Sequence, residues 1–134
     1  MILGIGNDME SISRIEAVLQ RRPNFLSTIL TPAEIEVAKQ RSGKHYLEFV
    51  AGRFSAKEAY SKALGTGIGK NASWQDITIL NAPSGRPLIR VKGQKHALSV
   101  AITHSGDYVS TIVTIERLSW FEKIKKKRWE NRLK

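Results

Sequence analysis

The chain has 134 residues, of which 41% are hydrophobic, and its formal net charge is +10. This length supports one ordinary core rather than two domains, and the absence of cysteine excludes disulfides, a thiol nucleophile and a cysteine-type zinc site. The first charge, Asp8, follows only seven residues and no basic flank precedes it, so we expect neither a signal peptide nor a membrane span and place the protein in the cytoplasm.

The amino-terminal segment predicts a buried strand. Residues 2–7 form a short apolar run that ends at Asp8, so the strand would deliver a carboxylate at its carboxyl end. Ser11 or Ser13 then offers an N-cap for a helix that runs to about Arg21.

Two further helices are expected after this one. The sequence Thr31-Pro32-Ala33-Glu34 is a capping box with proline at the first helical position, which predicts a helix from Pro32 to about Gln40. A longer helix begins near His45 and ends at Gly65, where glycine fits the left-handed cap. Its apolar stripe is made mostly of small residues, so we expect it to pack closely against another element.

Short β-rich runs fill the rest of the domain. Residues 77–80 and 88–91 flank a turn rich in proline, serine and glycine, which predicts a hairpin. Residues 99–103 and 108–115 predict a second hairpin with His104 at its bend. Helices followed by strands indicate an α+β fold.

The positive charge is concentrated at the carboxyl end. Residues 117–134 contain eight Lys or Arg against two Glu, a net +6, which leaves +4 for the other 116 residues. A body of modest positive charge suits an anionic ligand or an acidic partner. We therefore divide the chain into a domain of residues 1–118 and a basic tail of residues 119–134.

The long helix carries charged side chains beside its apolar stripe. Glu58 and Lys62 are one turn apart and nearly aligned, and Arg53 and Lys57 form a second aligned pair about 100° away. One helix therefore presents cations suited to phosphate next to a single acid. The alternative is an exposed helix whose Glu58 to Lys62 pair contributes only about 0.2 to 0.5 kcal/mol.

Asp8 and Glu58 are the candidate metal ligands. Two carboxylates are the usual protein share of a magnesium site that phosphate and water complete. The sequence alone does not bring these two acids together.

Two glycine-rich segments fail the common nucleotide motifs. The run 65–69 before Lys70 has Leu64 where a P-loop needs glycine, and Met9 stands at the third glycine of a dinucleotide fingerprint that would begin at Gly4. The run 65–69 is then either a loop whose amides line a phosphate or a helix stop and turn.

Several segments, in this order and spacing, resemble the bacterial holo-[acyl carrier protein] synthases, a family of 4′-phosphopantetheinyl transferases. The likeness spans roughly residues 1–118, and its most specific part is a Phe-x-x-Lys-Glu-Ala core with a Gly-Thr-Gly extension. The segments are Gly4-Ile5-Gly6-Asn7-Asp8, Ser13-Arg14-Ile15-Glu16, Leu30-Thr31-Pro32-Ala33-Glu34, Gly52 to Ile68, and Ile102-Thr103-His104-Ser105.

The resemblance implies the fold and the reaction of that family. The reaction is transfer of the phosphopantetheine arm from coenzyme A to a serine of apo acyl carrier protein in fatty acid biosynthesis, which leaves adenosine 3′,5′-bisphosphate. The family is homotrimeric, has its active site at the subunit boundary and depends on Mg²⁺.

The resemblance also implies roles for individual residues. Asp8 and Glu58 would hold Mg²⁺ against the pyrophosphate, Glu58 would act as base for the serine, and Lys62 would stabilise or protonate the leaving group. Arg14 and Arg21 on the first helix would bind the acidic carrier protein. The residues implied to contact coenzyme A are Arg53, Lys57, Lys62, Gly65, Gly67 and His104.

The chain departs from the family pattern in two places. Glu10 stands one position before the family's usual acid, so no role is carried to it. The tail interleaves aromatic residues with cations, and is either an interfacial helix at a membrane or partner, or a solvated basic extension.

Two rival functions remain open from the sequence. Charge and the basic aromatic tail also fit a nucleic-acid-binding domain or a membrane-surface module without catalysis. The transferase interpretation expects no nucleic acid and allows membrane contact through the tail.

Overall fold

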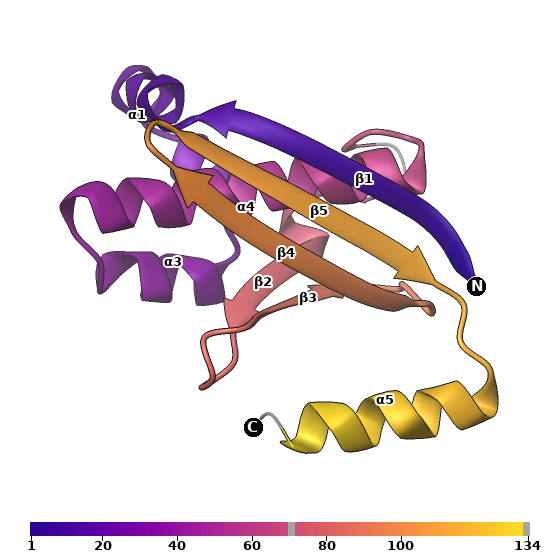
Figure 1. Ribbon diagram of the computed structural model, residues 1–134. Helices are drawn as coiled ribbons and strands as arrows, with labels where there is room; N and C mark the ends of the chain where they lie inside the picture. The colour runs from indigo at the N-terminus through magenta and orange to yellow at the C-terminus, as the bar shows by residue number, and fades with distance from the viewer. Residues whose placement is uncertain (70–71, 133–134) are drawn as a thin grey trace.

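A computed structural model describes residues 1–69 and 72–132 (Figure 1). This part of the chain is α+β, with a three-stranded antiparallel sheet in the order β1-β5-β4 and a separate antiparallel pair β2-β3. The elements are β1 (Ile2–Ser11), α1 (Ile12–Arg21), α2 (Phe25–Ile29), α3 (Pro32–Lys39), α4 (Gly43–Leu64), the 3₁₀ turn η1 (Trp74–Asp76), β2 (Ile77–Asn81), β3 (Pro87–Val91), β4 (Ala97–Ser105), β5 (Tyr108–Glu116) and α5 (Trp120–Arg132).

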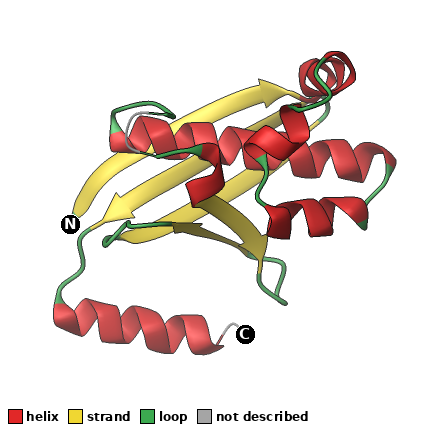
Figure 2. Ribbon diagram, turned by 180° about the vertical axis from the view of Figure 1, so that it is seen from behind, coloured by secondary structure: helices red, strands yellow, loops and turns green. Residues whose placement is uncertain are grey.

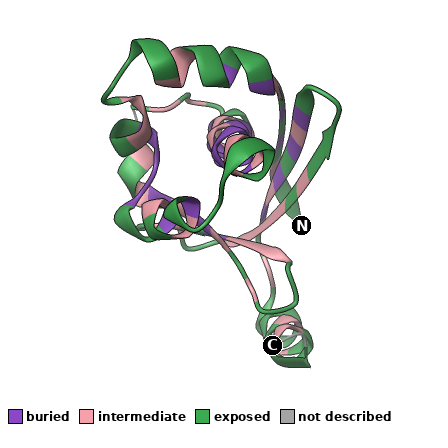
Figure 3. Ribbon diagram, turned by 90° about the vertical axis from the view of Figure 1, so that its left-hand side faces the viewer, coloured by how far each residue is buried: buried purple, intermediate pink, exposed green. Residues whose placement is uncertain are grey.

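The helix α4 is the centre of the fold. It packs on β1 and β5, and Figure 3 views it along its axis, enclosed between the sheet on one side and the shorter helices on the other. Figure 2 shows the helices α1 to α4 on the same face of the three-stranded sheet. Because both sides of α4 are covered, its middle turns are buried almost all round, polar positions included.

The strand β1 lies directly on the α4 backbone. A Cβ atom added at Gly4 would overlap the carbonyl oxygen of Ala63, and one added at Gly6 would overlap that of Ala59. The expected close packing of the small-residue stripe is therefore confirmed. The glycines bring the strand near enough for Asp8, two residues further on, to lie against the helix.

We expect Gly6→Ala to destabilise the fold by roughly 3 kcal/mol, because rigid backbone occupies the space that the methyl group needs. Urea unfolding of the purified chain measures this change. Glu16→Ala is the control, since Glu16 is exposed on α1 and the variant should lose little. Equal midpoints for the two variants would contradict the close approach.

Most of the expected local signals are confirmed. The capping box holds, with the Thr31 hydroxyl and the Glu34 carboxylate each bonded to the other residue's backbone N–H. Ser11 is the N-cap of α1, and Gly65 ends α4 in the left-handed region at φ 82°. Both expected hairpins form, β2 with β3 and β4 with β5.

Two expectations about element boundaries are wrong, and two short elements were missed. The first strand continues through Asp8 to Ser11, because β5 pairs with it along that whole stretch, so Asp8 lies within the strand. His104 belongs to β4, where it pairs with Val109, and the bend lies at Gly106 and Asp107. The short α2 and η1 were not expected.

Candidate active site

Asp8 is held at the junction of β1 and α4. Alternation along β1 turns Gly4, Gly6 and Asp8 toward the helix, and Asp8 is only 8% exposed. Its Oδ1 atom accepts a hydrogen bond from Lys62 Nζ at 3.0 Å. Its Oδ2 atom is buried and has no hydrogen-bond partner among the described residues. An unpartnered buried carboxylate oxygen is costly, so this geometry favours a further cation beside it.

Glu58 lies close to Asp8. It is on α4, one turn before Lys62, and its pKa is raised by burial and by the charge of Asp8, while Lys62 opposes the shift. The two acids, fifty positions apart in the chain, therefore interact electrostatically in the folded protein. Their shared negative charge exceeds what the single ammonium group of Lys62 balances.

Glu10 adds a third carboxylate to this neighbourhood. Burial, contact with the Asp8 carboxylate and the charge of Asp8 raise the pKa of Glu10 to about 7, and Arg14 opposes the shift. The sequence analysis carried no role to Glu10. Once β1 is known to run through Asp8, the two-residue spacing places both acids on one face of the strand.

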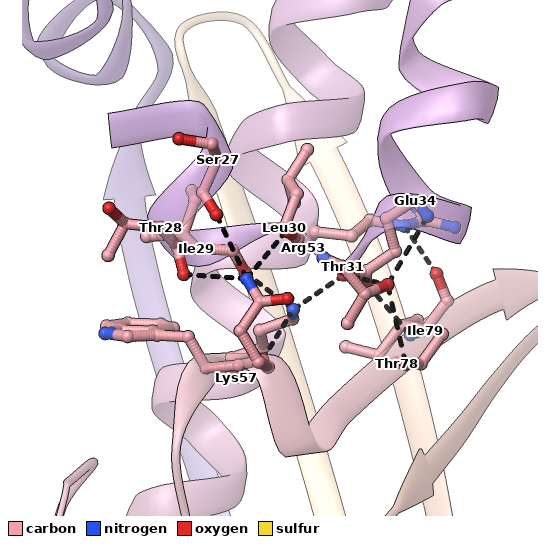
Figure 4. A network of polar contacts seen from close by, with 12 residues as sticks. Ser27, Thr28, Ile29, Leu30, Thr31, Glu34, Arg53, Lys57, Thr78 and Ile79 are labelled. Atoms are coloured by element: carbon pink, nitrogen blue, oxygen red, sulfur yellow. Dashed lines mark hydrogen bonds and ion pairs between the residues drawn. The ribbon is translucent and has the colours of Figure 1, made fainter. Parts of the chain in front are cut away.

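Lys57 is not available to a phosphate, and the expectation that it contacts coenzyme A is wrong. Its side chain is fully buried, and its ammonium group donates to Glu34 Oε1 at 2.6 Å, Ile29 O at 2.6 Å and Trp74 O at 3.1 Å (Figure 4). All three donors are used inside the protein. Lys57 is therefore a structural residue that ties the α2–α3 connection and η1 to α4.

Arg53 is buried but borders a cavity. Its guanidinium donates from Nε to Ile79 O at 3.1 Å and from Nη2 to Asn81 Oδ1 at 2.9 Å, and it stacks 4.1 Å above the centre of the Phe49 ring. Burial lowers its pKa to about 10, so it stays charged at neutral pH. Unlike Lys57, Arg53 lines an open space, a cavity of about 270 Å³.

His104 lines the same cavity as Arg53. His104 is half exposed, and its Nδ1 lies 3.6 Å from Glu48 Oε2. Arg41 and His45 also line the space, which makes it rich in cationic and titratable groups. The sequence analysis did not single out these two or Glu48. The spacing of positions 45, 48, 49 and 53 on one helix face is the signal that identifies the lining on α4.

The cavity and the acids are separate features of one chain. The lining residues of the cavity do not include Asp8, Glu58 or Lys62. The expected coenzyme-binding loop lies just past α4, with Gly67 at φ 67° and Gly69 at φ 105°. Lys70, which followed this loop in the sequence analysis, lies outside the described residues.

Arg14 and Arg21 are exposed on α1. They are seven residues apart, about two turns, so they lie on one side of the helix. The start of α1 is fixed by the β4–β5 turn, where Asp107 accepts hydrogen bonds from the Ser11 hydroxyl at 2.7 Å and the Ser13 backbone N–H at 2.9 Å. The helix that carries both arginines is thus anchored to the sheet.

We expect Asp107→Asn to lower the stability of the chain by more at pH 7 than at pH 3. Hydrogen bonds from Ser13 and Ser11 lower the pKa of Asp107, so its contribution is present above the ordinary value of 3.8 and is lost as pH falls through the lower folded value. Urea midpoints at the two pH values measure this, with Glu16→Gln on the exposed side of α1 as control. A variant gap that is equal at both pH values would contradict the account.

The residues present fit a divalent metal ion with oxygen ligands. Asp8 offers a buried oxygen without a partner among the described residues, and Glu58 offers a carboxylate whose pKa is raised by burial and by the charge of Asp8. Hard oxygen donors are what Mg²⁺ prefers, and it usually takes one or two carboxylates plus substrate phosphate and water. Within residues 1–69 and 72–132, no group of three or more His, Cys, Asp or Glu is placed to hold a metal.

The chain is similar to known proteins over most of its length. The family model of the 4′-phosphopantetheinyl transferase superfamily matches residues 4–113. A holo-[acyl-carrier-protein] synthase of Leuconostoc citreum is 58% identical over 124 residues, which cover 92% of each chain. One from a Geobacillus strain is 48% identical over 119 residues, covering 89% of this chain and all of that one.

Solved structures show the same relationship. A holo-(acyl-carrier-protein) synthase from Bacillus anthracis, in complex with CoA (3′,5′-ADP), has a TM-score of 0.82 and 44% identity and covers 88% of this chain and 99% of that one. The Helicobacter pylori holo-[acyl-carrier-protein] synthase in complex with coenzyme A has a TM-score of 0.73 and 37% identity, with 84% and 99% covered.

Proposed function

The chain belongs to the 4′-phosphopantetheinyl transferase superfamily, and from this premise we propose how its residues carry out the transfer. It is an enzyme that moves the 4′-phosphopantetheine arm of coenzyme A to apo acyl carrier protein. The alternative of a non-catalytic nucleic-acid or membrane module is not supported by these similarities. The observation that carries the assignment of residues is the unpartnered Asp8 oxygen beside Glu58 and Lys62.

The reaction joins the serine oxygen of the carrier protein to the phosphorus that bears the pantetheine arm. The bond from that phosphorus to the bridging oxygen breaks, and adenosine 3′,5′-bisphosphate leaves. Glu58 accepts the serine proton, and its raised pKa suits this role because a base works best near the ambient pH. Lys62, held by Asp8, faces the charge that develops on the leaving phosphate.

Magnesium is the cation proposed between Asp8 and Glu58. When bound, Mg²⁺ supplies positive charge that offsets the charge of the pyrophosphate in the transition state. The chain's own contribution is to hold the two carboxylates in fixed positions. The carboxylate of Asp8 is held by its burial and by its hydrogen bond from Lys62. Phosphoryl transfer is catalysed mainly by positioning and charge, so a nucleophilic side chain is not required.

The cavity at Arg53 and His104 is proposed to bind phosphates of coenzyme A. Arg53 is already oriented by Ile79 O and Asn81, so little side-chain freedom is lost when an anion binds. Because this cavity and the acids are distinct features of one chain, we propose that each coenzyme A contacts two subunits. The loop at Gly65 and Gly67 is proposed to bring its backbone to the same ligand.

We propose that the chain forms a homotrimer, and the outer face of the three-stranded sheet supports the presence of a subunit interface. The helices cover one face of this sheet, and Figure 1 shows the other face open. That face exposes large apolar side chains, which soluble proteins usually bury in an interface. They are Leu3 (46% exposed), Ile5 (61%), Met9 (64%) and Ile112 (48%).

Arg14 and Arg21 are proposed to bind the acidic surface of the carrier protein. We expect Arg14→Ala to raise the KM for carrier protein roughly tenfold and to leave kcat within about twofold, because it weakens association and not chemistry. The difference from the parent enzyme should shrink in high salt. Steady-state kinetics at two salt concentrations measure this, with Lys39→Ala on α3 as control. A fall in kcat at unchanged KM would contradict the role.

A mass assay tests the proposed function. Apo acyl carrier protein and coenzyme A are incubated with the enzyme in Mg²⁺, and the carrier protein is weighed intact. We expect a gain of one phosphopantetheine arm, lost when a chelator replaces the metal. No gain with Mg²⁺ would overturn the function, and a gain that survives the chelator would overturn the metal.

The remaining expectations concern the setting of the reaction. We propose that the enzyme serves fatty acid biosynthesis in the cytoplasm. Among the helices of residues 1–69 and 72–132, none has both the length and the apolar composition that crossing a bilayer requires.

A further inference from the structure

The helix α5 stands apart from the rest of the molecule. It follows the loop 117–119 and runs alongside β3 and β4 without a buried residue (Figures 1 and 2). Two contacts join it to the sheet and to the β2–β3 turn. Lys126 Nζ donates a hydrogen bond to Leu98 O at 3.4 Å, and the Arg86 guanidinium stacks on the Trp129 ring, 4.2 Å from its centre. The helix also lies beyond residue 113, where the match to the family ends. Nothing in the transfer reaction accounts for it.

The side chains of α5 are unevenly distributed around its axis. At about 100° per residue, Trp120, Phe121 and Ile124 fall within a sector about 100° wide. The two acids of the helix, Glu122 and Glu130, fall outside that sector and its flanks. The cations that lie within or beside the apolar sector are Lys125, Lys127, Arg128 and Arg132.

Most of this sector faces solvent. The α5 residues that border the cavity against β3 and β4 are Lys123, Lys126, Lys127, Glu130 and Asn131. Three of them, Lys123, Lys126 and Glu130, lie roughly opposite Phe121 on the helix, whereas Lys127 and Asn131 lie at the Trp120 edge of the sector. Trp120 is 68% exposed and Phe121 is 70% exposed. Their rings pack edge to face, with centres 4.9 Å apart, so together they make one apolar patch.

We propose that α5 binds the surface of an anionic lipid bilayer. Interfacial helices are low in overall hydrophobicity, rich in Lys and Arg, and carry Trp and Phe that enter the headgroup boundary, and α5 has each of these features. Trp120 and Phe121 would enter the headgroup region while Arg128 and its neighbouring cations pair with anionic headgroups. With 13 residues, α5 lies on the bilayer and does not cross it.

A bilayer fits this surface better than a nucleic acid does. Single strands are bound by aromatic rings whose faces are free for separate bases. Here the two rings pack on one another, and Ile124 extends the same patch with a side chain that offers no stacking face. The aromatic patch therefore favours lipid over bases, and binding to an oligonucleotide becomes an outcome of the test.

Vesicle sedimentation with the full chain tests the proposal. The vesicles contain either phosphatidylglycerol mixed equally with phosphatidylcholine, or phosphatidylcholine alone. We expect binding to the anionic vesicles only. The double variant Trp120→Ser, Phe121→Ser should weaken it roughly tenfold, and Lys125→Glu, Arg128→Glu should weaken it at least as much.

Two controls keep the outcome specific. Lys39→Glu, Lys92→Glu changes the net charge equally at exposed positions outside α5, and should leave binding within about twofold of the parent. All variants should retain the transferase activity and helical circular dichroism of the parent, because no site residue is changed. Vesicle binding is measured by sedimentation and not by transfer, so a failure of the proposed function would leave this test valid.

Three results would overturn the proposal. The first is no sedimentation of the parent chain with anionic vesicles. The second is binding that depends on the cations but not on the aromatic pair, since simple charge attraction would then suffice. The third is binding of a single-stranded oligonucleotide that excess anionic vesicles do not compete away.

Discussion

Asp8→Asn is expected to lower the rate of transfer roughly 10³-fold while leaving the fold intact. The change keeps the shape of the side chain and removes the charge that Lys62 and a metal ion would share. Because Oδ2 of Asp8 is buried without a partner in the described chain, losing that charge should cost little stability. The loss is measured as kcat/KM with coenzyme A and apo carrier protein, beside a urea unfolding curve.

Glu58→Gln should behave in the same way, and Glu36→Gln is the matched control. Glu36 is on α3 with a side chain 70% exposed, and it forms an ion pair with Lys39 at the surface. Its variant should keep full activity. An Asp8→Asn enzyme with more than about a tenth of the parent rate would contradict the role of that carboxylate.

Lys57→Met is expected to destabilise the protein by about 3 to 5 kcal/mol, a large share of the stability of a domain this size. The substitution leaves the charge of Glu34 buried without its ammonium partner, and the carbonyls of Ile29 and Trp74 lose a donor. Glu34 still accepts from the backbone N–H groups of Thr31 and Ile79, which limits the loss. Urea unfolding followed by circular dichroism measures it.

The double variant Lys57→Met, Glu34→Leu shows how much of the lost stability is due to the unpaired charge of Glu34. Removing both charges should recover part of the lost stability, because no unpaired charge then remains in the core. A Lys57→Met protein as stable as the parent but with weakened binding of coenzyme A would contradict the structural role. It would restore the phosphate role that the sequence analysis assigned.

Elements set by local chemistry could be predicted from the sequence. The capping box at Thr31 and the glycine at position 65 act through atoms only a few bonds away, so their positions follow from residue type. The short helix α2 lacks a side-chain cap, and its Asn24 N-cap accepts no such bond. Its formation depends on packing against the rest of the core, which no local pattern records.

The charged residues of α4 show where sequence reasoning stops. Helical spacing correctly aligns Lys57 with Arg53 and Lys62 with Glu58, but it does not say which side of the helix is covered. Glu34 was read only as a capping residue, and its second oxygen and its bond to Lys57 come from the tertiary fold. A buried cation therefore looked like a surface one.

The proximity of Asp8 to Glu58 is likewise a property of the fold. It follows from two glycines that let β1 lie on the α4 backbone, a contact made between segments that are far apart in the chain. The family resemblance supplied the pairing before the structure did. The sequence around each acid does not indicate that the two side chains lie close together.

Diffraction from crystals of the chain grown with coenzyme A and Mn²⁺ in place of Mg²⁺ tests the central claim most directly. The anomalous signal of manganese locates the ion without reference to the protein. We expect one manganese ion, bound by both Asp8 and Glu58 and by a phosphate oxygen of coenzyme A. An ion bound to neither acid, or coenzyme A bound with no ion beside these carboxylates, would contradict it.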